Sequence, residues 1–114
     1  MNQAGALAEQ LAAQYLQRQG LKLLQLNYRC RFGEIDLILQ DGATHVFAEV
    51  RLRSSAAFGG AAASIDARKQ AKLIRTAQHY LSGLKSIPPC RFDAILLQAT
   101  DSKDIEWIKN AFTA

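Results

Sequence analysis

The stretch 33–53 constrains the fold of this chain most, because its pattern predicts two β-strands joined by a tight turn. Asp41-Gly42 stands between the two strands, and this dipeptide favours the positive φ values of a two-residue hairpin turn. Side chains alternate between the two faces of a strand, so Glu34 and Asp36 share one face of the first strand. We expect Glu49, on the second strand, to lie on that same face of the hairpin.

The register of this hairpin determines whether the acidic side chains meet. If Asp41-Gly42 is the whole loop, Asp36 lies opposite Phe47, and Glu34 lies opposite Glu49. Asp36 and Glu49 are then diagonal neighbours, about 7 Å apart at Cβ, which is close enough for both to reach one metal ion. A slip by a single residue would place them on opposite faces of the sheet.

Composition indicates a single domain over residues 1–114. Apolar residues make up 49% of the sequence and charged residues 21%, as in an ordinary globular protein. No apolar run approaches the roughly 20 residues that cross a bilayer, so we expect a cytoplasmic protein that does not bind membranes. Cys30 and Cys90 form no metal-binding pattern, and we expect both thiols to be reduced.

The first helix is predicted over residues 4–20, with Gly20 as its stop signal. Glu9 falls at the border of the apolar face of this helix. It is either a solvated surface carboxylate or an acid that leans over the sheet edge towards Asp36 and Glu49.

A strand is predicted within residues 21–32, with Leu24, Leu26 and Tyr28 on one face. After the hairpin, residues 54–63 are small and include two glycines, which favours a surface loop able to close over a ligand.

A long helix is predicted over residues 64–81 with Ser64 as its N-cap, followed by strands at 91–99 and 105–108. Asp93 is expected to be a structural partner of a nearby basic residue. The crossover through the long helix should bring the fourth strand into the sheet parallel to one of the others. The sequence therefore predicts an α/β fold with a mixed sheet flanked by helices.

Basic residues give the chain a net charge of +4 and suggest an anionic partner. They are either solvated surface charges or contacts to nucleic-acid phosphates; the candidates are Arg29, Arg31, Arg53, Arg68, Lys69, Lys72 and Arg75. Lys69 differs from the others because it shares a helix face with Leu73 and Ala77. It should point towards the sheet, where a buried ammonium needs a carboxylate or a phosphate.

The pattern of an Asp on one strand and Glu-x-Arg on the next suits a metal-dependent phosphodiester hydrolase. Asp36 and Glu49 supply the hard oxygen ligands that Mg²⁺ or Mn²⁺ binds, and the Val50 carbonyl is a further candidate ligand. A bound metal lowers the pKa of a coordinated water. Arg51 returns to the face of Glu49 and would lie beside that water. Without a metal, Arg51 or Lys69 could neutralise the carboxylates instead.

Several segments together resemble one family: Gly33-Glu-Ile-Asp-Leu-Ile, Val46-Phe-Ala-Glu-Val-Arg-Leu-Arg, Lys69, Arg91-Phe-Asp and Trp107 with Asn110-Ala-Phe. Over nearly its whole length the chain resembles the YraN family of uncharacterised bacterial proteins. That family is similar to the restriction-endonuclease-like PD-(D/E)xK nucleases, including Holliday-junction resolvases of the archaeal type.

The resemblance implies a restriction-endonuclease-like αβββαβ core, with Asp36, Glu49 and residue 51 as the active-site triple and Glu9 as an acid of the first helix. The nuclease superfamily usually has Lys where this chain has Arg51. An arginine is effectively always protonated and cannot act as a general base, although it can hold a water or stabilise charge on the phosphate. The Pro of the superfamily motif is also absent, since Ile35 precedes Asp36.

Three hypotheses follow. The chain is a magnesium-dependent endonuclease that acts on nucleic acid, with DNA favoured and branched or damaged DNA as a candidate substrate. Alternatively, it is a non-catalytic nucleic-acid-binding module with the same fold. In the third, it is a scaffold in which the acidic and basic residues only form ion pairs. Cutting a four-way junction requires two active sites, which would make the protein a homodimer.

Overall fold

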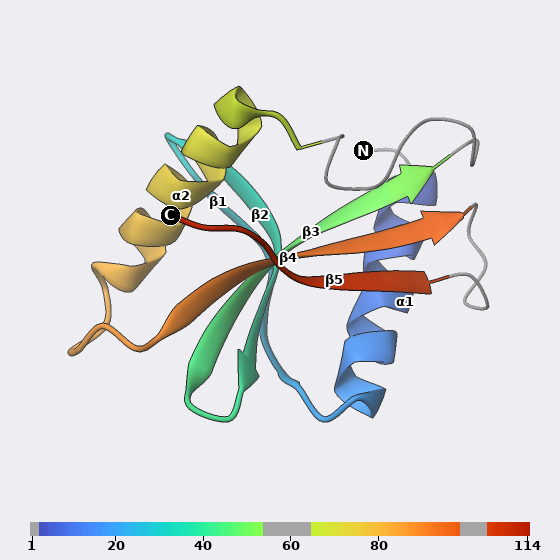
Figure 1. The fold of residues 1–114 in the computed structure, drawn as a ribbon, viewed down its shortest axis with the longest axis horizontal. Helices are drawn as coiled ribbons and strands as arrows, with labels where there is room; N and C mark the ends of the chain where they lie inside the picture. The colour runs from blue at the N-terminus through green and yellow to red at the C-terminus, as the bar shows by residue number, and fades with distance from the viewer. Residues whose placement is uncertain (1–2, 54–64, 99–104) are drawn as a thin grey trace.

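The computed structural model describes residues 3–53, 65–98 and 105–114, which form a five-stranded sheet with a helix on each face (Figure 1). In chain order the elements are α1 (Gln3–Arg18), β1 (Lys22–Cys30), β2 (Gly33–Asp41), β3 (Thr44–Arg53), α2 (Ala67–Leu81), β4 (Cys90–Gln98) and β5 (Ile105–Phe112). The strands lie side by side in sequence order; β3 and β4 are parallel, and the other neighbours are antiparallel. The predicted mixed sheet flanked by helices is confirmed, and its order is compatible with an αβββαβ core.

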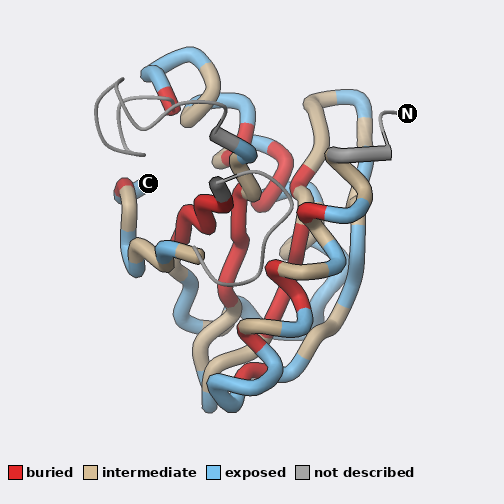
Figure 2. Tube along the Cα trace, turned by 90° about the vertical axis from the view of Figure 1, so that its right-hand side faces the viewer, coloured by how far each residue is buried: buried red, intermediate tan, exposed pale blue. Residues whose placement is uncertain are grey.

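Two apolar cores hold the helices on the sheet. Helix α1 buries Ala8, Ala12 and Leu16 at a spacing of four residues, which forms a stripe along one side of the helix. These side chains pack on Leu37 and Leu39 of β2, while α2 packs on the opposite face of the sheet. Buried segments, red in Figure 2, run through the middle of the molecule, so the central strands are covered on both faces.

Helix α2 begins at a different cap from the predicted one. Asp66 is the N-cap, and its carboxylate accepts the backbone N–H of Lys69 at 2.9 Å. The predicted cap at Ser64 was therefore wrong. Ser64 and the predicted loop at 54–63 lie outside the described residues. Neither described helix is long and apolar enough to cross a membrane.

The β2–β3 hairpin has a different register from the predicted one. Asp41 pairs with Thr44, which leaves Gly42 and Ala43 as the two loop residues. Gly42 has a φ of 60°, whereas Ala43 has no positive φ, as in a II′ turn with glycine at its first central position. Opposed pairs are therefore shifted by two residues from the prediction. An even shift does not by itself move a side chain to the other face of the sheet.

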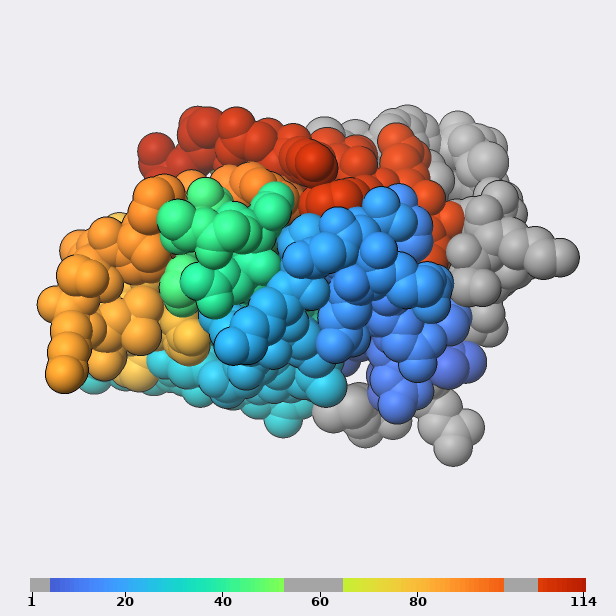
Figure 3. Space-filling view, turned by 90° about the horizontal axis from the view of Figure 1, so that it is seen from below, coloured from blue at the N-terminus to red at the C-terminus, as the bar shows by residue number. Residues whose placement is uncertain are grey.

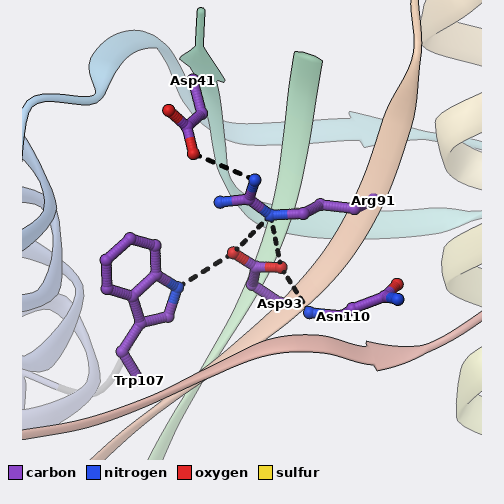
Figure 4. A network of polar contacts seen from close by, with 5 residues as sticks. All are labelled: Asp41, Arg91, Asp93, Trp107 and Asn110. Carbon is purple, nitrogen blue, oxygen red and sulfur yellow. Dashed lines mark hydrogen bonds and ion pairs between the residues drawn. The ribbon is translucent and has the colours of Figure 1, made fainter.

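A buried polar network fixes β5 against β4 (Figure 4). The Asp93 carboxylate accepts hydrogen bonds from Arg91 Nε at 3.1 and 3.2 Å, from Trp107 Nε1 at 2.9 Å and from the backbone N–H of Asn110 at 2.9 Å. Asn110 has a φ of 55°, and the β4–β5 pairing shifts register at Asp93. Arg91 also forms an ion pair with Asp41 at 2.9 Å. Asp93 is thus a structural partner of a basic residue, as predicted, and it satisfies a backbone group that the irregular strand leaves without its regular partner.

Candidate active site

The side chains of strand β2 change face at Asp36, and we call this rotation the turnover of the strand. Ile35 packs in the core on the α2 side of the sheet, whereas Leu37 packs in the core on the α1 side. In a regular strand two residues at this spacing would share one face. The strand therefore rotates at Asp36, between two fully buried neighbours.

Strand β1 makes the matching change at Asn27, which has a φ of 52°. Leu26, opposite Leu37, faces α1, while Tyr28 contacts His79 on α2. The expectation that Leu26 and Tyr28 share one face was wrong. Asparagine tolerates a positive φ better than other residues with a side chain, which explains how β1 can turn over here.

The turnover of β2 directs the Asp36 side chain at the neighbouring strand. Regular β2–β3 pairing ends at Leu37 and Ala48, and the Asp36 carboxylate accepts the backbone N–H of Val50 at 2.9 Å. The carboxylate thus takes the place of a backbone carbonyl where the two strands part. Continued by one residue, the observed register sets Asp36 opposite Glu49.

Glu49 is almost fully buried, with 5% of its side chain exposed, and it lies between two cations. Lys69 Nζ is 3.1 Å from Glu49 Oε2, and Arg51 Nη2 is 3.4 Å from the same oxygen. Lys69 reaches the sheet from α2, in the direction that its helix face predicts. Strand alternation predicted that Arg51, two residues beyond Glu49 on β3, lies on the same face as Glu49.

The carboxylates of Asp36 and Glu49 both have raised pKa values. The pKa of Glu49 is raised from 4.5 to about 7, first by burial and then by the hydrogen bond and the negative charge of Asp36, against the lowering effect of Lys69. Burial also raises the pKa of Asp36, and the charges of Glu9 and Glu34 add to that effect. Two carboxylates in contact cannot both ionise easily, so the pair tends to retain a proton or to bind a cation.

Glu9 lies at the edge of this site. It is half-buried on α1, and its negative charge acts on both Asp36 and Arg29. Within the described parts of the chain, three His, Cys, Asp or Glu side chains do not gather into one metal-binding cluster. Glu9 is therefore near the carboxylate pair without completing a three-residue ligand set.

Glu34 lies elsewhere than the first register implied. It pairs with Arg29 across the β1–β2 ladder, and the two side chains form an ion pair. The expectation that Glu34 lies opposite Glu49 was wrong, because the II′ turn moves the register by two residues. The hydrogen bond and charge of Glu34 raise the pKa of Arg29, which therefore stays protonated.

The turn between β1 and β2 packs closely on α2. Gly33 has a φ of 150°, and a Cβ there would be 3.1 Å from Thr76 Oγ1. The hydroxyl of Tyr28 and Nδ1 of His79 are hydrogen-bonded at 2.5 Å. Arg31, in the turn, holds its guanidinium 4.9 Å from the Phe32 ring centre. This packing brings the turn with its basic residue to the side of the sheet that carries α2.

The predicted nucleic-acid-binding residues come from β1, the turn after it, β3 and α2. Lys69 enters the carboxylate site, while Arg29 and Arg31 are exposed on β1 and the turn after it. The remaining exposed candidates lie on α2: Arg68, Lys72 and Arg75. Arg53 ends β3 opposite Gln98, and its side chain lies outside what the structure describes.

The residues present fit a magnesium ion. Mg²⁺ commonly takes one or two carboxylates from the protein and completes its shell with waters and substrate phosphate. Asp36 and Glu49 supply two such carboxylates, and burial raises the pKa of both, so a bound cation would favour their ionised forms. Sequence reasoning identified both residues, but it missed the turnover at Asn27 that shapes the site.

Fold and site together define an α/β protein with a mixed sheet and a buried carboxylate pair flanked by Arg51 and Lys69. The model of the uncharacterised protein family UPF0102 matches residues 8–97, and the chain belongs to this family, which is the YraN family of the sequence analysis. The match contains all of the carboxylate and cation residues of the site.

Bacterial relatives match the chain over nearly its full length. A UPF0102 protein of Nitrosomonas europaea is 62% identical over 108 residues, which cover 95% of this chain and 92% of the relative. One from Methylobacillus flagellatus is 60% identical over 114 residues, the whole of both chains. One from Psychromonas ingrahamii is 57% identical over 113 residues, covering 97% of this chain and 90% of the relative.

Proposed function

We propose that this protein is a Mg²⁺- or Mn²⁺-dependent endonuclease of the bacterial cytoplasm that hydrolyses phosphodiester bonds in nucleic acid, with DNA as the favoured substrate. The observation that carries the proposal is the contact between Asp36 and Glu49, two carboxylates with raised pKa values beside Arg51 and Lys69. A site that concentrates negative charge and holds cations at its rim suits a metal ion together with a phosphate.

Each residue has a distinct role in this proposal. Asp36 and Glu49 hold the metal, which supplies Lewis acidity and an activated water when bound. The Val50 N–H fixes the Asp36 carboxylate at 2.9 Å. The Val50 carbonyl points to the same side of the strand as its N–H, which keeps it a candidate ligand.

In this proposal Arg51 and Lys69 together take the role of the single lysine in the PD-(D/E)xK nucleases that the family resembles. Arg51 stays protonated, so it stabilises negative charge that develops on the phosphate. Lys69 reaches the site from α2 and orients the attacking water from that side. Glu9, at the rim, holds a second ion or orients water.

The remaining basic residues would contact phosphates along the substrate. They are Arg29, Arg31, Arg53, Arg68, Lys72 and Arg75. Each phosphate contact releases counterions, so DNA affinity should fall steeply with salt. Reversing the charges of Arg68, Lys72 and Arg75 should weaken binding.

Cleavage of linear, nicked and four-way DNA in Mg²⁺ or Mn²⁺ tests the proposal. Wild-type protein should cut at least one of these substrates, and Asp36→Asn and Glu49→Gln should not. Asp66→Asn is the matched control, because asparagine caps a helix as well as aspartate does and Asp66 lies outside the carboxylate pair. Cleavage without metal, or equal cleavage by the two site variants, would refute the proposal.

A non-catalytic nucleic-acid-binding module is the second candidate, and the arginine at position 51 favours it. This function predicts salt-dependent DNA binding without cleavage in any divalent metal. Symmetric cutting of a branched substrate would require a second copy of the chain. Sedimentation with and without a four-way junction measures whether such a dimer forms.

A further inference from the structure

A hollow of about 460 Å³ opens between α1 and β1, on the α1 side of the candidate active site. Its lining comes from two neighbouring elements: Ala6, Leu7, Glu9 and Gln10 on α1, and Leu26 and Asn27 on β1. Figure 3 shows α1 in blue beside the lighter blue and cyan of β1 on this face of the molecule. The volume lies within the range of small-ligand sites, about 300–1,000 Å³.

The walls of the hollow are apolar and exposed. Leu7 is 42% exposed and Leu26 is 44% exposed, although both are large apolar side chains. One projects from the helix and the other from the strand, so a flat apolar ligand would bury both. Such burial is favourable, because it removes apolar surface from water.

Besides the Glu9 carboxylate, the hollow has two polar side chains, and both are carboxamides. Gln10 and Asn27 each offer an N–H donor and a carbonyl acceptor, which is the combination that pairs with the edge of a nucleobase. The positive φ of Asn27, 52°, holds this residue at the turnover of β1. A ring-shaped ligand with a donor and an acceptor on its edge therefore fits the hollow better than a hydrocarbon does.

The hollow and the carboxylate pair share one border. Glu9 lines the hollow, and its negative charge acts on Asp36. Leu26, in the opposite wall, pairs across the β1–β2 ladder with Leu37, the residue after Asp36. A nucleotide bound here would thus be a neighbour of the phosphate held at Asp36 and Glu49.

We propose that this hollow takes one unpaired nucleobase of the bound strand, next to the phosphate that is cut. The inference rests on the proposed function for its substrate, and it narrows that substrate to nucleic acid with a single-stranded or splayed nucleotide at the site. A base inside a continuous duplex is paired and stacked, and it reaches such a hollow only when it is unstacked at a free-energy cost.

Binding in EDTA tests this proposal without any cleavage. The probes are a short fluorescent single-stranded DNA, the duplex of the same sequence and the matching single-stranded RNA, followed by fluorescence anisotropy. Leu26→Ala removes one wall, and Ala6→Phe fills the hollow. Leu84→Ala is the control, since Leu84 is similarly exposed, at 36%, and lines a different surface.

Each hollow variant should bind single-stranded DNA about tenfold more weakly, because stacking and burial of one base are lost, and should bind duplex like wild type. Asn27→Gly keeps the positive φ and removes the carboxamide, so it should reduce the preference among the four bases. Equal losses on both DNA forms, or none, would overturn the proposal. Tight RNA binding that the same variants weaken supports it and identifies RNA as the source of the base.

A spectroscopic experiment on the wild-type protein tests the proposal even if the hollow variants do not fold. The base analogue 2-aminopurine, placed in turn along the single strand, should fluoresce more strongly at one position on binding wild-type protein, because a base in the hollow leaves its stacked neighbours. A uniform response along the strand would contradict the proposal. A protein that shows this pattern and never cuts DNA would refute the nuclease alone, whereas one that cuts without it would refute only the hollow.

Discussion

The carboxylate of Asp36 accepts the backbone N–H of Val50 at 2.9 Å, at the point where β2 and β3 cease to pair. An acidic side chain here completes the backbone hydrogen bonding of β3 and also faces a second buried acid, Glu49. The Asp36 carboxylate therefore stabilises the fold through its hydrogen bond and destabilises it through repulsion with Glu49. This double role leads to predictions that separate structural effects from functional ones.

Asp36→Asn should stabilise the metal-free protein and abolish its metal-dependent activity. The asparagine carbonyl can still accept the Val50 N–H, while the repulsion with Glu49 disappears. Asp36→Ala should be less stable than Asp36→Asn by about 1–3 kcal/mol, because a buried N–H loses its acceptor. Urea denaturation in EDTA measures both variants. An asparagine variant no more stable than the alanine variant would contradict the role given to this hydrogen bond.

The metal-free protein should lose stability as the pH rises from about 4.5 to about 7. The Glu49 pKa is raised from 4.5 to about 7, so the folded protein binds more protons than the unfolded chain in this window. The raised pKa of Asp36 acts in the same direction. The total change should be a few kcal/mol, and Glu49→Gln should remove most of it. Denaturation at a series of pH values in EDTA gives the free energy of unfolding as a function of pH. A free energy of unfolding that rises over this window would refute the raised pKa of Glu49.

Magnesium should raise the melting temperature of the wild-type protein above pH 7, where the Glu49 carboxylate is mostly ionised and can act as a ligand. At a concentration of 100 times the dissociation constant, a ligand of the folded state adds about 3 kcal/mol. Asp36→Asn should respond much less, whereas the cap variant Asp66→Asn should respond like wild type. Calorimetric scans with and without Mg²⁺ compare the three proteins, and equal shifts in all of them would show that the ion binds elsewhere.

Lys69→Met should reduce cleavage by about 100-fold or more, since the variant loses the ammonium group that orients the attacking water. It should also raise the pKa of Glu49 further, because Lys69 lowers that pKa in the wild type. Arg51→Lys should retain activity, as it keeps a cation on the face of Glu49. Single-turnover rates over a range of pH measure these effects. Full activity of Lys69→Met would exclude the proposed role of Lys69.

Asp93→Ala should destabilise the protein by about 3–5 kcal/mol, because a half-buried Arg91 and two N–H groups lose their acceptor. Trp107→Phe should cost only about 1 kcal/mol for its single hydrogen bond. Denaturant titration measures both variants. DNA binding by the folded fraction should remain, and a selective loss of binding would mean that Asp93 has a role beyond structure.

Sequence patterns predicted the elements whose side-chain periodicity is regular. The helix face of Lys69 was readable because Leu73 and Ala77 mark its buried side. The hairpin was predicted from Asp41-Gly42, but the turn forms one residue later, because Gly42 occupies the first central position of a II′ turn. The acidic pair survived this error, since a two-residue shift conserves the faces.

The turnover of β1 and β2 could not be predicted in the same way. β1 has leucines at neighbouring positions, Leu23 and Leu24, so alternation does not mark one buried face. Asn27 was a signal of positive φ, but asparagine is also an ordinary polar residue in an edge strand. Without the turnover, the hollow between α1 and β1 is invisible in the sequence.

The parallel pairing of β3 with β4 gives the site a folding order. The hairpin that carries Asp36, Glu49 and Arg51 consists of local contacts, which we expect to form first. Lys69 arrives only when α2 packs on the sheet, after a longer loop has closed. We expect a nascent chain to hold the acidic pair before its second counter-charge, so that the competent site appears only in the last stage of folding.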